Sequence, residues 1–268
     1  MGKTTKYVAK VPDRHGYIPY TPAENAVWRD LITRQRPIVE KYACDDYLEA
    51  LERMDFPADR IPQCKEVSAV LRQHTGWEVA SVPALIPFDQ FFALLADKKF
   101  PAASFIRSRE EMDYLQEPDI FHEVFGHTPL LTDPRFAEFT HAYGKAGVKA
   151  DKKDHMMLAR LYWFTVEFGL ISTRKGLKTY GAGIVSSFGE TPYSIESHQP
   201  LRKPFDPIDA LRTPYRIDIF QTTYFIINSL EDMFNLAHKN LIGLINEARQ
   251  LGMYEPNFPP AETKVSWA

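Results

Sequence analysis

The sequence predicts a single, mainly α-helical domain of the α+β class with only a few short strands. Three observations support this prediction. Apolar residues recur at spacings of three and four in several long segments, as on the buried face of a helix. Alternating patterns typical of strands are brief. No repeat, low-complexity tract or shift in composition marks a linker, so we expect one domain over residues 1–268.

The overall composition excludes several classes of protein. Hydrophobic residues make up 44% of the chain, charged residues 25%, and the net charge is −3, which does not suit a nucleic-acid partner. No apolar stretch approaches the ~20 residues of a membrane span, and the N-terminus lacks the apolar core of a secretion signal. We therefore expect a cytoplasmic protein, with Cys44 and Cys64 as free thiols.

The N-terminal quarter is expected to combine an extended arm with helices. Residues 1–22 carry prolines and no clear period, which predicts an extended N-terminal arm. Pro22 suits the first position of a helix, and apolar residues then recur at helical spacing as far as Met54. Because proline disrupts a helix interior, we expect two helices broken near Pro37.

The next segments alternate between helix and connection. Residues 65–75 predict a short helix closed by Gly76, and 77–86 alternate briefly like a strand. A further helix is expected over 88–100. Residues 107–120 have few apolar side chains and predict a connecting loop, which leaves room for one strand around 105–107.

A short, distorted helix is expected around residue 120. Pro118 followed by Asp119 indicates a helix start, because proline loses nothing at the first position and an acid there meets the positive end of the helix dipole. Gly126 and Pro129 bracket His127, so this helix must end in an irregular turn.

The second half of the chain predicts two longer helices. The first is expected over about 153–172 and the second over about 223–249. A glycine-rich segment, 178–190, follows the first, and a proline-containing connection leads to the second.

The stretch PDIFHEVFGHTP, residues 118–129, contains two histidines and an adjacent glutamate. It is similar to the zinc peptidase pattern H-E-x-x-H, but His122 and His127 are five residues apart, which places them about 140° apart on a regular helix. One metal ion could bind both only if the helix is distorted between them, as Gly126 and Pro129 indicate. The remaining histidines are interpreted as structural.

Glu167 is the only acidic or basic residue in the apolar segment LYWFTVEFGLI. A carboxylate on a buried helix is costly unless a cation or hydrogen-bond donors meet it. Donors from tyrosine or tryptophan side chains would satisfy it without any catalytic role. Two imidazoles and one carboxylate, however, are the set that binds non-haem Fe(II) and leaves positions open for dioxygen.

Three motifs, PDIFHEVFGHTPL, LYWFTVEFGL and YGAGIVSSFGE, resemble in order and spacing the catalytic domain of the aromatic amino acid hydroxylases. These are pterin-dependent, non-haem iron monooxygenases, and the resemblance clearly covers about residues 80–230. It implies a mainly helical catalytic domain with Fe(II) in a cleft between helices. It also implies a tetrahydropterin cofactor, O2 as co-substrate, and iron ligands His122, His127 and Glu167.

The resemblance also implies substrate-binding residues. Arg107 corresponds to the arginine that binds the substrate carboxylate, for which a guanidinium offers two parallel hydrogen bonds, and Asp119 would orient it. An apolar wall beside the substrate ring is implied for Pro118, Trp163 and Phe168. Contacts with the amino acid end of the substrate are implied for Gly183 and Ser186.

Six residues are implied on the pterin side. Phe91 corresponds to the aromatic residue that stacks on the pterin ring, and Leu85 and Ile86 to positions that offer backbone hydrogen bonds. Ala159 and Tyr162 are implied to line the same cavity. Glu123 is implied to face it and to act through water.

The expected substrate is L-phenylalanine. The chain carries no segment like the regulatory domain or tetramerisation helix of the animal enzymes, and so resembles bacterial members that act on phenylalanine, which favours a monomer in phenylalanine catabolism. Ile217 lies near the position where tyrosine-specific relatives carry an acid, and an apolar residue there favours phenylalanine, whereas Asp218 at that position would reverse the inference. The alternatives are a tryptophan or tyrosine hydroxylase, a zinc hydrolase and a non-catalytic helical protein.

Overall fold

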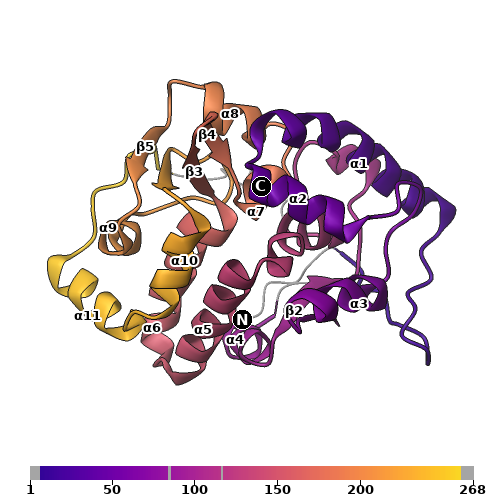
Figure 1. The fold of residues 1–268 in the computed structure, drawn as a ribbon, viewed down its shortest axis with the longest axis horizontal. Coiled ribbons are helices and arrows are strands. Elements are labelled where there is room, and N and C mark those ends of the chain that lie inside the picture. The colour runs from indigo at the N-terminus through magenta and orange to yellow at the C-terminus, as the bar shows by residue number, and fades with distance from the viewer. Residues whose placement is uncertain (1–6, 84–85, 116, 261–268) are drawn as a thin grey trace, which may run out of the picture.

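A computed structural model of the chain describes residues 7–83, 86–115 and 117–260. It confirms a mainly helical α+β fold (Figure 1). The α-helices are α1 (Pro22–Tyr42), α2 (Asp45–Met54), α3 (Cys64–His74), α4 (Phe88–Ala96), α5 (Pro134–Lys149), α6 (Lys152–Tyr162), α7 (Ala182–Val185), α8 (Glu190–Glu196), α9 (Pro207–Arg212), α10 (Leu230–Ala237) and α11 (Leu241–Leu251). Four short turns of other helix types are η1 (Arg109–Glu111), η2 (His122–His127), η3 (Leu130–Thr132) and η4 (Trp163–Glu167).

The strands form two small sheets, the larger beside α8 and the smaller beside α3 (Figure 1). In the smaller sheet β1 and β2 pair in parallel. In the larger the order is β4-β3-β6-β5, with β6 parallel to both β3 and β5 and with β3 and β4 antiparallel. The strands are β1 (Glu78–Val82), β2 (Lys99–Ala103), β3 (Gly169–Thr173), β4 (Gly176–Thr179), β5 (Leu201–Pro204) and β6 (Thr223–Ile227).

The N-terminal helix is longer than expected. Pro22 does begin α1, where Thr21 and Glu24 form a reciprocal capping box. The expected break near Pro37 is wrong, because α1 continues through it to Tyr42. Packing outweighs the hydrogen bond that proline removes. Gln35, two residues earlier, is buried and its amide donates to Val185 O at 2.8 Å.

The segments that follow match the prediction in part. The helix closed by Gly76 is confirmed as α3, and the brief alternation after it is β1. The helix expected over 88–100 stops at Ala96, and the strand expected around 105–107 is instead β2, a few residues earlier. Helix α5 was not predicted. It packs closely on α4, where Gly144 lies against the backbone of Leu95.

The helix expected over 153–172 is wrong at its C-terminal end. It ends in the turn η4, and β3 begins at Gly169. A side chain at Gly169 could not be accommodated, because its Cβ would lie 2.2 Å from the Tyr180 ring and 2.4 Å from Thr165 O. The connection after it contains α8, β5 and α9, none of which was predicted.

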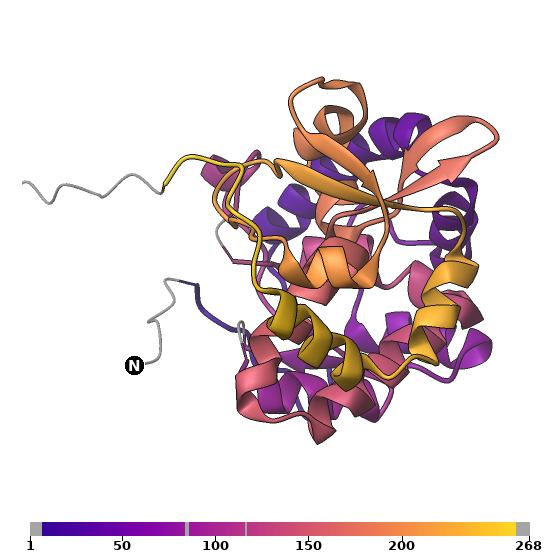
Figure 2. The ribbon, with the colours of Figure 1, turned by 90° about the vertical axis from the view of Figure 1, so that its left-hand side faces the viewer.

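The helix expected over 223–249 is also wrong at its start. Residues Thr223–Ile227 form β6, the strand between β3 and β5. A strand that is buried in a parallel sheet is apolar throughout, so it lacks the alternation that distinguishes a strand from a helix. Helices α10 and α11 follow, and α11, yellow in Figure 2, packs against α9 and α6.

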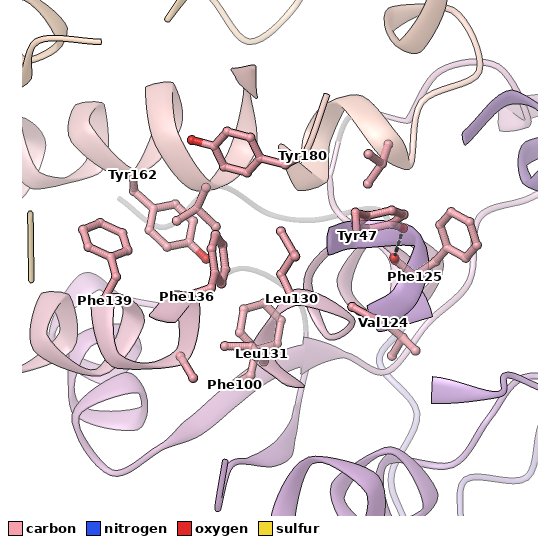
Figure 3. Packing of buried hydrophobic residues seen from close by; sticks show 14 of the residues in the cluster. Tyr47, Phe100, Val124, Phe125, Leu130, Leu131, Phe136, Phe139, Tyr162 and Tyr180 are labelled. Carbon is pink, nitrogen blue, oxygen red and sulfur yellow. Dashed lines mark hydrogen bonds between the residues drawn. The ribbon is translucent and has the colours of Figure 1, made fainter. Parts of the chain in front are cut away.

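One large hydrophobic core extends through the molecule and surrounds the segment that carries the two histidines (Figure 3). Phe121, Val124 and Phe125 are almost fully buried, with exposed fractions of 1% or less. The Phe121 and Phe125 rings stack at 4.9 Å. In the described part of the chain, no helix combines the length and hydropathy that a membrane crossing needs.

Candidate metal and substrate site

His122 and His127 lie at the two ends of η2, which is a single turn of π-helix. A π-helix closes its hydrogen bonds between residues five apart, so side chains at that spacing point to the same side. The two Nε2 atoms are accordingly 3.1 Å apart. The distortion expected at Gly126 and Pro129 is therefore a widening of the helix, and it brings the two imidazoles together.

The wide turn follows from residues around it. Pro129, four residues after Phe125, has no N–H to close an α-helical bond onto the Phe125 carbonyl. The buried hydroxyl of Tyr47 donates to this carbonyl at 2.7 Å instead (Figure 3). Gly126 lies close to α7, where a Cβ would be 2.9 Å from Ala182 O.

Tyr47→Phe is expected to destabilise the protein by about 1–3 kcal/mol, because it leaves the buried Phe125 carbonyl without its donor. It should also weaken metal binding, since the turn that aligns the histidines loses a support. Urea unfolding and metal titration measure the two effects. Tyr42→Phe is the matched control, because the Tyr42 hydroxyl bonds to exposed Glu196, and it should change neither quantity by much.

Glu167 reaches the histidines from a second π-helical turn, η4. Its Oε1 lies 3.2 Å from His127 Nε2 and its Oε2 lies 3.6 Å from His122 Nε2. All three side chains are at most 16% exposed. The alternative in which Glu167 is satisfied by tyrosine or tryptophan donors is not what the structure shows, because the carboxylate faces the two imidazoles.

Burial and neighbouring charges give the groups of this cluster different protonation states. Burial lowers the pKa of His122 to about 4, so its imidazole is neutral. Burial alone would raise the pKa of Glu167, but His127 and His122 outweigh it and lower that pKa. Burial, with the charges of Glu167 and Asp119, raises the pKa of Glu123 well above its usual value. Glu167 is thus ionised while Glu123 is neutral.

Glu123 is the competing carboxyl group. The ligand atoms of His122, Glu123 and His127 also lie within 4.8 Å of one another, so distance alone admits this set. Glu123 Oε2 is 4.0 Å from His127 Nε2, however, which is farther than Glu167 Oε1. Glu167 also contacts both histidines. Glu167 is therefore the better placed third ligand.

Ser186 fixes the orientation of His122. The Ser186 hydroxyl donates to Ala182 O at 2.7 Å, so its oxygen accepts from His122 Nδ1, 2.9 Å away. With the proton on Nδ1, the lone pair of Nε2 points toward the other two side chains. Ser186 was expected at the amino acid end of a substrate. The structure places it directly against this histidine.

The cluster has the chemistry of a metal site. Its three groups offer two imidazole nitrogens and one carboxylate, the set typical of non-haem iron. In the described part of the chain, two buried polar atoms beside it lack hydrogen-bond partners, His127 Nδ1 and the Tyr162 hydroxyl. Native proteins leave few such groups unpaired, so a bound ion, water or cofactor is expected here.

Arg107 and Asp119 form a buried ion pair next to the cluster. Arg107 Nε and Nη2 each donate to Asp119 at 2.9 Å, and the Arg107 backbone N–H donates to the same carboxylate at 2.9 Å. Asp119 also accepts from the His122 N–H at 3.1 Å, so it caps the helix instead of lying in its first turn as expected. No hydrogen bond among the described residues uses Arg107 Nη1, which leaves it for an incoming acceptor.

An aromatic wall stands beside Glu167. The Trp163 ring lies between Phe168 and Tyr215, with centroids 4.4 Å from each. Gly183 makes room for this wall, since a Cβ there would be 2.7 Å from the Phe168 ring. The Gly183 backbone also hydrogen-bonds Glu167. Pro118, the remaining residue expected in the wall, is half-buried just before Asp119.

The residues expected on the pterin side gather around Tyr162. The Phe91 ring packs edge-on against Tyr162 at 5.5 Å, and Tyr162 stacks near His127 at 6.2 Å. Ile86 and Ala159 are half-buried. Leu85 lies outside the described residues.

Sequence reasoning missed Glu190 and Gln221, which are both buried beside the wall. The Gln221 backbone N–H donates to Glu190 Oε1 at 2.9 Å, and the Tyr224 hydroxyl donates to the same oxygen. Burial raises the pKa of Glu190 from 4.5 to about 7. Glu190 stands at the end of YGAGIVSSFGE, so the only available signal was an acid within an apolar, glycine-rich motif.

Glu190→Gln is expected to change how stability depends on pH. Because the folded pKa of Glu190 is raised, its contribution to stability is present below about 4.5 and is lost as pH rises through about 7. The wild-type protein should therefore lose roughly 3 kcal/mol over this window that the variant keeps. Urea unfolding at pH 5 and pH 8 tests this. Glu247→Gln, an exposed change on α11, should leave the pH dependence as in the wild type.

The fold and the cluster together define a class: a helical protein with the ligand set of mononuclear non-haem iron oxygenases. Comparison with known proteins agrees. The family described as biopterin-dependent aromatic amino acid hydroxylase matches residues 3–248. The chain belongs to this family.

Individual relatives are close over nearly their whole length. A phenylalanine-4-hydroxylase of Pseudomonas aeruginosa is 55% identical over 97% of this chain and 99% of its own. The apo structure of the cold-active phenylalanine hydroxylase from Colwellia psychrerythraea 34H is 54% identical, with a TM-score of 0.92 over 94% of this chain and 98% of its own. A Chromobacterium violaceum phenylalanine hydroxylase structure with bound oxidised Fe(III) is 42% identical, with a TM-score of 0.87 over 94% of this chain and 92% of its own.

Proposed function

We propose that this protein is a phenylalanine 4-monooxygenase, which hydroxylates L-phenylalanine to L-tyrosine with O2 and a tetrahydropterin. The observation that carries the proposal is the convergence of His122, His127 and Glu167 on one point. Family membership supplies the reaction class, and relatives named phenylalanine-4-hydroxylase support phenylalanine as the substrate. The apolar side chain of Ile217 agrees with that preference.

His122, His127 and Glu167 would hold the iron. Ser186 keeps the His122 proton on Nδ1, so that Nε2 is available to the metal. Glu123 would remain outside the ligand set, near the pterin. When bound, iron and the tetrahydropterin activate O2 so that one oxygen atom enters the aromatic ring. A zinc hydrolase is not favoured, because the chain belongs to a pterin-dependent family.

Arg107 would bind the substrate carboxylate through Nη1, while Asp119 holds its other two nitrogens. Because Asp119 also caps the helix that carries His122, one segment would hold both the substrate-binding arginine and a metal ligand. Trp163 and Phe168, with Pro118, would enclose the aromatic ring and exclude water from it. Gly183 would allow the close approach of this wall. On the other side, Phe91, Ile86, Ala159 and Tyr162, together with Leu85, would hold the pterin.

The direct test is anaerobic loading with Fe(II), followed by phenylalanine, a tetrahydropterin and O2, with tyrosine quantified. Tyrosine should form in an amount that depends on all three additions. If tryptophan or tyrosine is hydroxylated and phenylalanine is not, the substrate assignment is wrong. Activity that zinc alone supports, without pterin or O2, would overturn the reaction assignment.

We further propose that the protein acts in phenylalanine catabolism as a cytoplasmic monomer, with no nucleic-acid or membrane partner. The modest net charge of −3 supports the absence of a polyanionic partner. Light scattering after size-exclusion chromatography should give a mass near 30.8 kDa, whereas a multiple of this value would contradict the monomer.

A further inference from the structure

Gln221 joins the aromatic wall to the loop that covers it. Its side-chain oxygen accepts from Trp163 Nε1 at 2.9 Å. Its amide nitrogen donates to Arg216 O at 2.9 Å and to Ile219 O at 3.3 Å. The orientation of the amide is unambiguous, because an indole N–H can only donate and the two carbonyls can only accept. Gln221 itself is 4% exposed, so water has little access to its amide.

The backbone of Gln221 is held as firmly as its side chain. Its N–H donates to Glu190 Oε1 at 2.9 Å, and Glu190 is itself buried on α8. The Tyr224 hydroxyl, on β6, donates to the same oxygen. One residue thus connects η4, α8 and the beginning of β6.

The loop closed by Gln221 carries Tyr215, which contacts the aromatic wall, and Ile217, which was singled out for substrate preference. Tyr215 stacks on Trp163 with an interplanar angle of 20°, so it covers the face of the indole that Phe168 leaves open. Ile217, whose apolar side chain agrees with a preference for phenylalanine, lies in the same loop and is 60% exposed. The positions of Tyr215 and Ile217 therefore depend on the hydrogen bonds that anchor the loop at Gln221.

We propose that Gln221 is a positioning residue that determines substrate specificity by locking the 215–221 loop and the Trp163 indole in one arrangement. This inference rests on the proposed function, in which Trp163 borders the substrate ring. Without the Gln221 amide, one indole N–H and two loop carbonyls lose their partners in a partly buried setting. The wall then samples other positions, and the pocket binds its preferred ring less selectively.

The test is Gln221→Met, which keeps the length of the side chain and removes its polar atoms. With the iron-loaded enzyme, KM for phenylalanine should rise about tenfold while kcat stays within about twofold. KM for the tetrahydropterin should not change. The preference for phenylalanine over tryptophan, measured as the ratio of kcat/KM values, should fall by about the same factor.

Two comparisons separate positioning from general stability. Asn257→Ala is the matched control, because the Asn257 amide donates hydrogen bonds to Thr222 and Thr223, the residues next to Gln221, and none to Trp163. It should leave KM for phenylalanine within about twofold of the wild type. In a Trp163→Phe background, which has no indole N–H, Gln221→Met should have little further effect on KM. A Gln221→Met protein with a lower Tm but unchanged KM and selectivity would overturn the proposal, as would an equal effect in both backgrounds.

If the Gln221→Met variant does not fold, a variant with a shorter amide side chain tests the same proposal. Gln221→Asn keeps the polar group but is one methylene too short to reach Trp163 Nε1, and the same rise in KM is expected. Failure of the proposed function appears in the wild-type enzyme, which would then make no tyrosine. In that case the same ratios are measured with whichever aromatic amino acid the wild type hydroxylates.

Discussion

Glu167→Ala is expected to lower iron affinity by more than about 100-fold and tyrosine formation by about 1,000-fold or more. Losing even an outer partner of a metal ligand commonly costs 10–100-fold in affinity. Glu167 is the group that contacts both histidines, at 3.2 Å and 3.6 Å. Its removal would leave two imidazoles with no carboxylate in contact with both of them. Iron content after dialysis and single-turnover tyrosine formation measure the two effects.

Glu123→Gln is the matched control for this change. It alters the other carboxyl group beside the histidines, 4.0 Å from His127 Nε2. This variant should retain iron to within about twofold of the wild type, whatever its effect on the pterin. If Glu123→Gln loses iron while Glu167→Ala keeps it, the third ligand is Glu123, and the assignment made from these distances is wrong.

Asp119→Asn is expected to have the second largest effect, on both stability and substrate binding. Asp119 is fully buried and holds the Arg107 guanidinium through two hydrogen bonds of 2.9 Å. Breaking a buried ion pair by removing one partner typically costs about 3–5 kcal/mol, because the other charge stays buried without compensation. Arg107 would also lose its orientation, so KM for phenylalanine should rise by about 100-fold. Urea unfolding and steady-state kinetics measure these changes.

Asp97→Asn provides the same chemical change in an exposed ion pair. Asp97 bonds Lys99 on the surface, with 68% of its side chain exposed, so its removal should cost less than about 1 kcal/mol and leave KM unchanged. If Asp119→Asn is as mild as this control, the buried pair does not organise the substrate site. A protein that is destabilised but keeps its KM would confine Asp119 to a structural role.

Local features of the fold could be predicted where a few residues decide them. Pro22 and the Thr21–Glu24 capping box begin α1, and Gly76, with its positive φ of 75°, follows α3. These signals depend on backbone sterics and on hydrogen bonds within one turn. The distortion around Gly126 was predictable for the same reason, since Pro129 removes a donor wherever the segment lies.

Errors arose where packing outweighs a local preference. Helix α1 continues through Pro37 because buried Gln35 bonds to Val185, which is 150 residues away. The segment at Thr223–Ile227 is a strand because β3 and β5 pair on both sides of it. Its apolar run has no period that distinguishes a buried strand from a buried helix. Partners so distant in sequence leave no local signal.

The same division applies to the candidate site. The sequence by itself determined the family, through three motifs, and the two histidines whose spacing requires a widened helix. The family resemblance implied Glu167 as the third ligand, whereas the contact of its carboxylate with both imidazoles is seen only in the tertiary structure. Glu123 is adjacent in sequence, but Glu167, forty residues away from His127, is closer in space. The buried network of Glu190 and Gln221 behind Trp163 is likewise visible only after folding, because hydrogen bonds between separate elements depend on how those elements pack.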